Sequence, residues 1–326
     1  SHIFSDNTIE RTIGFSMLSK ALGGPSWTGA GMGDFGARPR DFGYQPNHQQ
    51  LIDWRHQFID IAVESGLDQD LERSSSARRV LADKFRSLWR QDAVRQQLID
   101  AATQLNDQRT WSEGWKAVQS TLYFGNRCLA KEPDLDFGID SLVALKNDLR
   151  PTDLISNVNA YLFGRSIDLW SLDPDFDHDD TSKYEAARTR IAATVTDFGR
   201  EFASSKTHIS ELDDKLFSAS SMAYGEAFGR GLALGSADVR STWEELTAGL
   251  RGFGEMNFNC SVLSGFLDQV AETNDYGLAQ EILDECAGDP QLRTVIVQLH
   301  QYGNFTETDL DRCMAVLADP DVSGWA

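Results

Sequence analysis

The chain has 326 residues, and its 41% hydrophobic content is enough to build a substantial apolar core. Its formal net charge of −20 argues against nucleic acid, because phosphate backbones are bound by neutralising them with Lys and Arg, and against an anionic membrane surface for the same reason. No apolar run approaches the roughly 20 residues that a membrane-spanning helix needs, and no signal peptide is visible. We therefore expect a cytoplasmic protein without nucleic-acid or membrane partners.

The first third of the chain has helical periodicity. Residues 48–65 and 77–90 each carry an apolar stripe at helical spacing, and the first stripe consists of Leu51, Trp54, Phe58 and Ile61. Thr110-x-x-Glu113 predicts a capping box, in which the Thr hydroxyl and the Glu carboxylate accept hydrogen bonds from backbone N–H groups at a helix start. These patterns predict a helical N-terminal region over residues 1–130.

The remaining residues, 131–326, read as shorter helices joined by short linkers. Amphipathic segments are predicted at 142–149, 154–163, 184–202, 212–228, 239–253, 262–270, 278–283, 292–299 and 310–317. Asp289-Pro290 and Asp319-Pro320 stop two of these helices thirty positions apart, and Phe-Gly-Arg recurs at 163, 198 and 228. Such spacings are typical of helix-pair repeats. The predicted fold is all-α, a helical-repeat α-solenoid (α-α superhelix) with the additional N-terminal region.

Residues 23–46 form a Gly-rich stretch without periodicity. Gly31-x-Gly33-x-x-Gly36 matches the dinucleotide-binding pattern literally, but a helix precedes it and Pro39 follows it, whereas the fingerprint works between a strand and a helix N-terminus. We interpret the stretch as a partner-binding loop, because aromatic and arginine side chains are common at interface hot spots. An equally good interpretation is that the aromatic side chains of this stretch pack against the first helices. The candidate partner-binding residues are Trp27, Phe35, Arg38, Arg40, Phe42 and Tyr44.

An acidic segment supplies the candidate metal ligands. Asp173, Asp175, Asp177 and Asp179 occupy positions 1, 3, 5 and 7 of a calcium loop, but the glycine at position 6 and the glutamate at position 12 are missing. A solvated acidic linker is the alternative, so we expect no cofactor unless this segment binds a divalent cation. His178-Asp179 is also the dipeptide of all-α metal-dependent phosphohydrolases, which keeps an enzymatic reading open.

Two further features bear on packing and partners. Glycines at 225, 229, 231 and 235 place small residues at i, i+4 on one helix, which predicts close approach of another helix. Residues 1–130 hold 15 basic and 15 acidic side chains, whereas residues 131–326 hold 15 basic and 35 acidic ones. This asymmetry indicates two surfaces with different neighbours, or simply a solvated acidic face. The four widely spaced cysteines predict free thiols in a reducing compartment.

Several stretches together resemble a known family. They are Arg38-Pro39-Arg40-Asp41-Phe42-Gly43-Tyr44-Gln45-Pro46, the helix around Trp54, the step Leu149-Arg150-Pro151-x-x-Leu154 into Tyr161, and Asn259-Cys260-Ser261-Val262-Leu263-Ser264-Gly265-Phe266-Leu267. The chain is similar to the long helical regions that follow the NTPase module in large bacterial STAND-type antiphage proteins. The resemblance implies a sensor that docks a viral protein and so licenses the NTPase and an effector domain. The chain has no P-loop, so the implied role is recognition without catalysis.

The two ends of the chain add an expectation about its context. It begins Ser1-His2 without a Met and ends shortly after a helix stop, so we expect a segment truncated at its C-terminus and joined to further domains of a parent protein. Its function is then expected to be non-catalytic recognition of a protein partner, such as a phage protein. The alternatives are a structural or oligomerisation scaffold and the metal-dependent phosphohydrolase.

Overall fold

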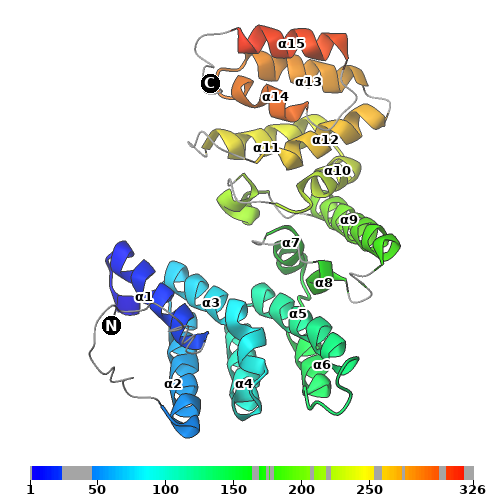
Figure 1. Cartoon of the computed structure of the whole chain (residues 1–326). Helices are drawn as coiled ribbons and strands as arrows, with labels where there is room; N and C mark the ends of the chain where they lie inside the picture. The colour runs from blue at the N-terminus through cyan, green and yellow to red at the C-terminus, as the bar shows by residue number, and fades with distance from the viewer. Residues whose placement is uncertain are drawn as a thin grey trace, which may run out of the picture. The chain divides into compact units, whose positions relative to one another are not determined.

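The computed structural model describes residues 2–23, 46–163, 169–173, 176, 180–205, 209–217, 222–252, 259–273, 276–300 and 306–318. Within these ranges the chain forms fifteen α-helices and three 3-10 helices, and no strand (Figure 1). The backbones of Phe163 and Met222 make one isolated antiparallel bridge. The predicted all-α class is confirmed. In the part of the chain that is described, no helix is both long and apolar enough to cross a membrane.

The chain divides into two compact units, Ser1–Pro151 and Thr152–Ala326. The sequence predicted a boundary near residue 130, whereas the contacts divide the chain about twenty residues later, because the helix at Ile139–Asp148 packs against the one before it. The first unit contains η1 (His2–Phe4), α1 (Thr8–Leu22), α2 (His48–Gly66), α3 (Leu71–Trp89), α4 (Asp92–Gln108), α5 (Ser112–Leu129) and α6 (Ile139–Asp148).

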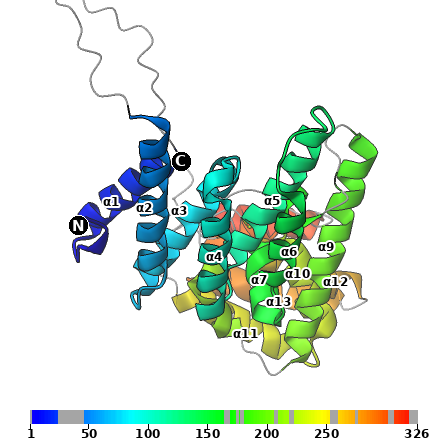
Figure 2. The ribbon, with the colours of Figure 1, turned by 90° about the horizontal axis from the view of Figure 1, so that it is seen from below.

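Helices of the first unit contact their near neighbours in sequence. The helices α2, α3 and α4 lie side by side, and α3 also packs against α5 (Figures 1 and 2). Local capping sets where they begin: the Asp70 carboxylate accepts from the backbone N–H of Glu72 and Arg73, which starts α3 six residues before the predicted range. Asn47 and Gln50 form a capping box at the start of α2.

The apolar stripe predicted for residues 48–65 is only partly buried. In α2 the buried line is Ile59, Ala62 and Gly66, while Trp54 is half exposed. The helix α2 packs against both α3 and α4, and the small residues Ala62 and Gly66 in this line allow a close approach. A Cβ on Gly66 would stand 2.7 Å from a methyl group of Leu105. Periodicity therefore identified the helix but not its buried face.

A buried arginine ties two helix ends of the first unit together. Arg78 is 3% exposed and donates hydrogen bonds to the carbonyl oxygens of Gly66 (3.0 Å), Leu105 (2.9 Å) and Arg109 (2.9 Å). These carbonyls belong to the C-terminal ends of α2 and α4, where the helix dipoles favour a cation. Burial, followed by repulsion from Arg109, lowers the pKa of Arg78 to about 10, so it is charged at neutral pH.

The second unit is also entirely helical where it is described. It contains α7 (Leu154–Leu162), α8 (Leu169–Leu172), α9 (Thr181–Ser204), η2 (Ile209–Leu216), α10 (Gly225–Gly235), α11 (Val239–Gly252), α12 (Ser261–Glu272), α13 (Tyr276–Gly288), η3 (Arg293–Val295), α14 (Ile296–Leu299) and α15 (Glu307–Leu317). Contacts again run between near neighbours, and α13, α14 and α15 group together at the end of the unit (Figure 1).

The glycine-rich helix α10 is the tightest joint of the unit, as its sequence predicted. It packs against α9 on one side and α12 on the other. A Cβ on Gly229 would lie 2.8 Å from the backbone nitrogen of Phe266, and one on Gly231 would lie 2.9 Å from Cα of Gly199. Because these neighbours are backbone atoms, only glycine permits the two close approaches.

Three local predictions are wrong. The capping box at Thr110 does not form, because the N-cap of α5 is the fully buried Trp111. The single helix predicted for 212–228 is instead η2 and the start of α10, separated by the chain that pairs Met222 with Phe163. The Phe-Gly-Arg copies at 198 and 228 fall near the C-terminal end of α9 and near the start of α10, so they do not mark equivalent repeat positions.

Candidate functional site

The partner-binding residues proposed from sequence, Trp27, Phe35, Arg38, Arg40, Phe42 and Tyr44, lie outside the described residues. The same holds for Asp175, Asp177, Asp179 and His178. Asp173 is described, and its buried carboxylate accepts hydrogen bonds from Arg190 at 2.7 and 2.9 Å. The protein therefore already supplies this carboxylate with a cation. Within the described ranges, no group of three or more His, Cys, Asp and Glu side chains is placed to hold a metal ion.

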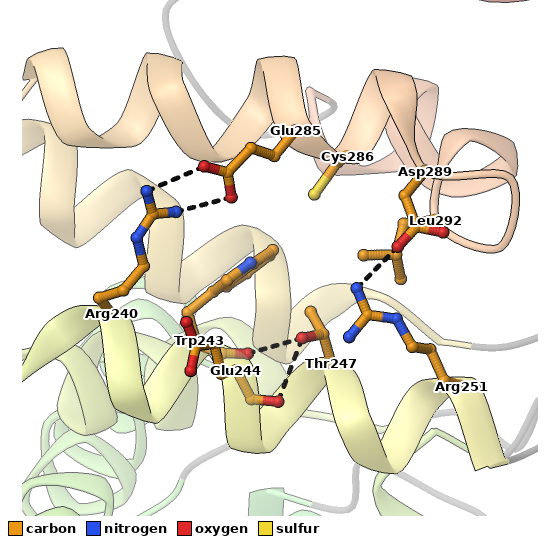
Figure 3. A pocket seen from close by; sticks show the side chains of 9 residues that line it. All are labelled: Arg240, Trp243, Glu244, Thr247, Arg251, Glu285, Cys286, Asp289 and Leu292. Atoms are coloured by element: carbon orange, nitrogen blue, oxygen red, sulfur yellow. Dashed lines mark hydrogen bonds and ion pairs between the residues drawn. The ribbon is translucent and has the colours of Figure 1, made fainter.

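A groove lined by described residues of the second unit is a candidate site. It lies between α11 and α13, has a volume of about 510 Å³, and continues to the residues that follow α13. Figure 3 shows charged side chains at its two ends and aromatic, hydroxyl and thiol side chains between them. Its lining residues are Arg240, Trp243, Glu244, Thr247, Arg251, Glu285, Cys286, Asp289 and Leu292.

Ion pairs cross the groove at both ends. Arg240 on α11 makes two hydrogen bonds with the Glu285 carboxylate on α13, at 2.7 and 2.9 Å (Figure 3). Arg251 pairs with Asp289 at 2.7 Å. The two arginines are eleven positions apart on one helix, which corresponds to about 16 Å along its axis. The hydrogen bonds with Glu285 raise the pKa of Arg240 against the opposing effect of burial.

The base of the groove is almost closed to solvent. Trp243 is 4% exposed and its ring lies 6.0 Å from that of Phe266, which anchors α11 on α12. The Thr247 hydroxyl donates to the Trp243 carbonyl oxygen at 3.0 Å. Burial, and then the charges of Asp289 and Glu285, raise the pKa of Cys286 to about 12, so its thiol is protonated at neutral pH and is a poor nucleophile. These side chains close the base of the groove and are not arranged for nucleophilic catalysis.

One carboxylate of the groove differs from the others. Glu244 is exposed and lies one helical turn after Arg240. Among the described residues, no cation forms an ion pair with Glu244, whereas Glu285 and Asp289 both have arginine partners. Because Arg240 is already committed to Glu285, the free acceptor capacity of the groove lies on Glu244.

A second charged cluster, close to the groove, serves packing. Arg312 on α15 is buried and donates to Asp309 (2.8 Å), Asp284 on α13 (2.9 Å) and Gln280 on α13 (2.6 Å). His300 lies 3.4 Å from the Arg312 guanidinium and 3.9 Å from the Asp309 carboxylate. The cluster joins α13 to α15 through bonds between side chains that already satisfy one another.

Sequence reasoning missed the groove for a simple reason. Arg240 and Glu285 are 45 positions apart, and no local motif links them. The only sequence signal is a tryptophan flanked by a basic and an acidic residue on a helix, a pattern that many surface helices share.

Comparison with known proteins adds no relative: no family model matches the chain, no curated protein is significantly similar to it, and no solved structure matches it significantly. The fold and the groove together define an all-helical protein with a charged, non-nucleophilic cleft.

Proposed function

We propose that this chain is a non-catalytic recognition segment of a larger cytoplasmic protein, and that its partner is a protein. The observation that carries the proposal is the packing of the helices against near neighbours in sequence, which is typical of helical arrays. Such an array, which we take to be an α-solenoid, presents a large surface that is ordered before binding. Binding then costs little conformational entropy, which favours recognition.

The proposed biological setting is bacterial antiviral defence, with a phage protein as the partner. It rests on the resemblance to STAND-type antiphage proteins, part of which falls on α12 around Asn259–Leu267. In that setting the chain would bind the viral protein, and catalytic domains elsewhere in the parent protein would respond. The chain's own contribution would be affinity and selectivity.

Affinity capture during infection tests the proposal. The tagged chain is expressed in bacteria, and proteins bound to it are identified by mass spectrometry with and without phage infection. We expect one phage protein to be enriched only after infection, and then to bind the purified chain at a defined stoichiometry in isothermal titration calorimetry. If infected cells give no phage protein that also binds the purified chain, the proposed function is wrong.

An oligomerisation scaffold is a second candidate, and exposed apolar stripes favour it. On α1 the side chains of Ile9, Ile13 and Met17 are 72%, 50% and 60% exposed. Their spacing of four residues places them on one face of the helix. On α15 a similar exposed line is formed by Leu310, Met314 and Leu317. The residues at these positions would be buried if another helix packed there.

Light scattering coupled to size-exclusion chromatography distinguishes the two candidates. A scaffold built on α1 would form a homo-oligomer that Ile13→Lys dissociates, whereas Thr12→Lys, which adds the same charge at a neighbouring exposed polar position, would leave it intact. A chain that stays monomeric over a hundredfold range of concentration would eliminate the scaffold.

A further inference from the structure

The groove between α11 and α13 has a surplus of negative charge. Its lining holds two arginines and three carboxylates, and each arginine is paired with a carboxylate across the groove. Glu244 is the carboxylate left over. The surrounding unit has the same sign, since Thr152–Ala326 contains 12 basic and 30 acidic side chains. A ligand that enters this groove therefore meets a negative potential and one unpaired acceptor.

We propose that the groove binds a short peptide segment of the protein partner that carries an arginine or a lysine, and that Glu244 receives this cation. The proposal rests on the proposed function and names the chemistry of the partner at this site. A guanidinium or an ammonium supplies the donors that the Glu244 carboxylate lacks. Trp243, one position before Glu244, is 4% exposed and packs on Phe266, so it fixes this part of α11 without competing for the cation.

The dimensions of the groove fit a peptide of a few residues. Its volume of about 510 Å³ lies in the usual range for ligand sites. The ion pairs at its ends are about 16 Å apart along α11, a length that about five residues of extended chain cover. Leu292 and Trp243 are only 3% and 4% exposed, so they form the closed base of the groove and the charged side chains form its accessible walls. The site thus offers a ligand mainly one charge contact, with Glu244.

An anionic ligand suits the groove less well. It would have to displace Glu285 from two hydrogen bonds with Arg240, or Asp289 from Arg251, and leave that carboxylate without its cation. Breaking such a pair costs free energy. A cationic ligand avoids this cost because it binds the free carboxylate of Glu244. The paired arginines also hold α11 against α13, so the groove keeps its width while Glu244 stays available.

Fluorescence anisotropy of the full chain tests the assignment. The probe is a fluorescein-labelled peptide of sequence Arg-Gly-Arg-Leu-Arg-Gly-Arg, and the comparison peptide has Glu in place of each Arg. We expect the basic peptide to bind and the acidic one not to bind. Glu244→Gln should weaken binding of the basic peptide about fivefold, the effect of losing one partly exposed ion pair.

A second substitution should change affinity in the opposite direction. Arg240→Gln frees the Glu285 carboxylate from its partner, while the Arg251–Asp289 pair still holds α11 against the end of α13, so the groove gains an acceptor and the basic peptide should bind about threefold more tightly. Matched controls on α9 alter the net charge equally: Glu201→Gln and Arg200→Gln lie on exposed positions away from the groove. We expect both controls to stay within about twofold of the unchanged chain.

Three results would overturn the inference. The first is an equal effect of Glu244→Gln and Glu201→Gln, which would mean attraction to the overall charge only. The second is tighter binding of the acidic peptide. The third is displacement of the basic peptide by equimolar spermidine, which would show that a free polyamine fits the site as well as a protein segment. If the captured partner still binds Glu244→Gln with unchanged affinity, this inference fails while the proposed function stands.

Discussion

Substitution of Gly229 by alanine tests whether backbone contact at α10 holds the second unit together. The added Cβ would lie 2.8 Å from the Phe266 nitrogen, 2.9 Å from the Val262 carbonyl carbon and closer still to the Val262 oxygen, whereas ordinary contact begins at 3.4 Å. All three neighbours are backbone atoms of α12, so no side chain can rotate away. The two helices must separate, which loosens the packing along their whole contact.

The steric strain by itself should lower the unfolding free energy by about 3 kcal/mol. This value is at the upper end for overpacking because the strain cannot be relieved locally. The intrinsic preference of alanine for helix returns up to about 1 kcal/mol, so the net loss should be 2 to 3 kcal/mol, roughly. Urea unfolding followed by circular dichroism measures the change, and hydrogen exchange of α10 and α12 amides locates it in the second unit.

Gly277→Ala is the matched control. A Cβ at this position of α13 meets nothing within 4 Å, so the same change of residue should stabilise the chain slightly, by up to about 1 kcal/mol. The reasoning is refuted if Gly229→Ala unfolds at the same urea concentration as the unchanged chain. It is equally refuted if Gly277→Ala destabilises as much as Gly229→Ala, since the effect would then not depend on the close approach.

Three other predictions concern charged groups. Arg78→Met should cost about 3 kcal/mol, because three backbone carbonyls lose their donor, while the exposed neighbour Arg79→Met should cost almost nothing in the same urea titration. A double-mutant cycle of Arg240 and Glu285 should give a coupling of about 0.5 to 1 kcal/mol that declines in high salt, and a salt-independent coupling would contradict the ion-pair account. Burial lowers the pKa of His300 below 6.5, so the neutral ring is favoured in the folded state and stability should fall as pH drops through 6.5. Hydrogen exchange at α15 should accelerate on acidification, and His300→Gln should reduce that response.

Much of the helix content was readable from sequence because helical periodicity is a local property. The stripe at 262–270 became α12, and its predicted apolar residues are all buried. At α15 the same reasoning failed in part: Cys313 is buried, but Leu310 and Met314 of the predicted stripe are exposed. Spacing along a helix shows that a face is apolar, and only the neighbouring helices decide whether that face is covered.

The candidate site was much less predictable than the fold. Composition directed attention to the Gly-rich loop at 23–46, whose binding role stays a prediction because most of it lies outside the described residues. The groove depends on Arg240 and Glu285 meeting across two helices, and on Glu244 having no cationic partner among the residues that the structure describes. Neither property leaves a trace in the local sequence, because both depend on which helices become neighbours.

The sequence by itself determined that this protein is all-helical and that the segment 225–235 allows a close helix approach. Both follow from interactions within a few residues: the 3.6-residue period and the absence of a Cβ at successive i, i+4 positions. Only the tertiary structure decided that α9 and α12 are the helices that use this approach, that Arg78 caps two helix ends, and that α11 and α13 enclose a charged groove. These outcomes depend on packing between residues far apart in the chain, which local periodicity does not encode.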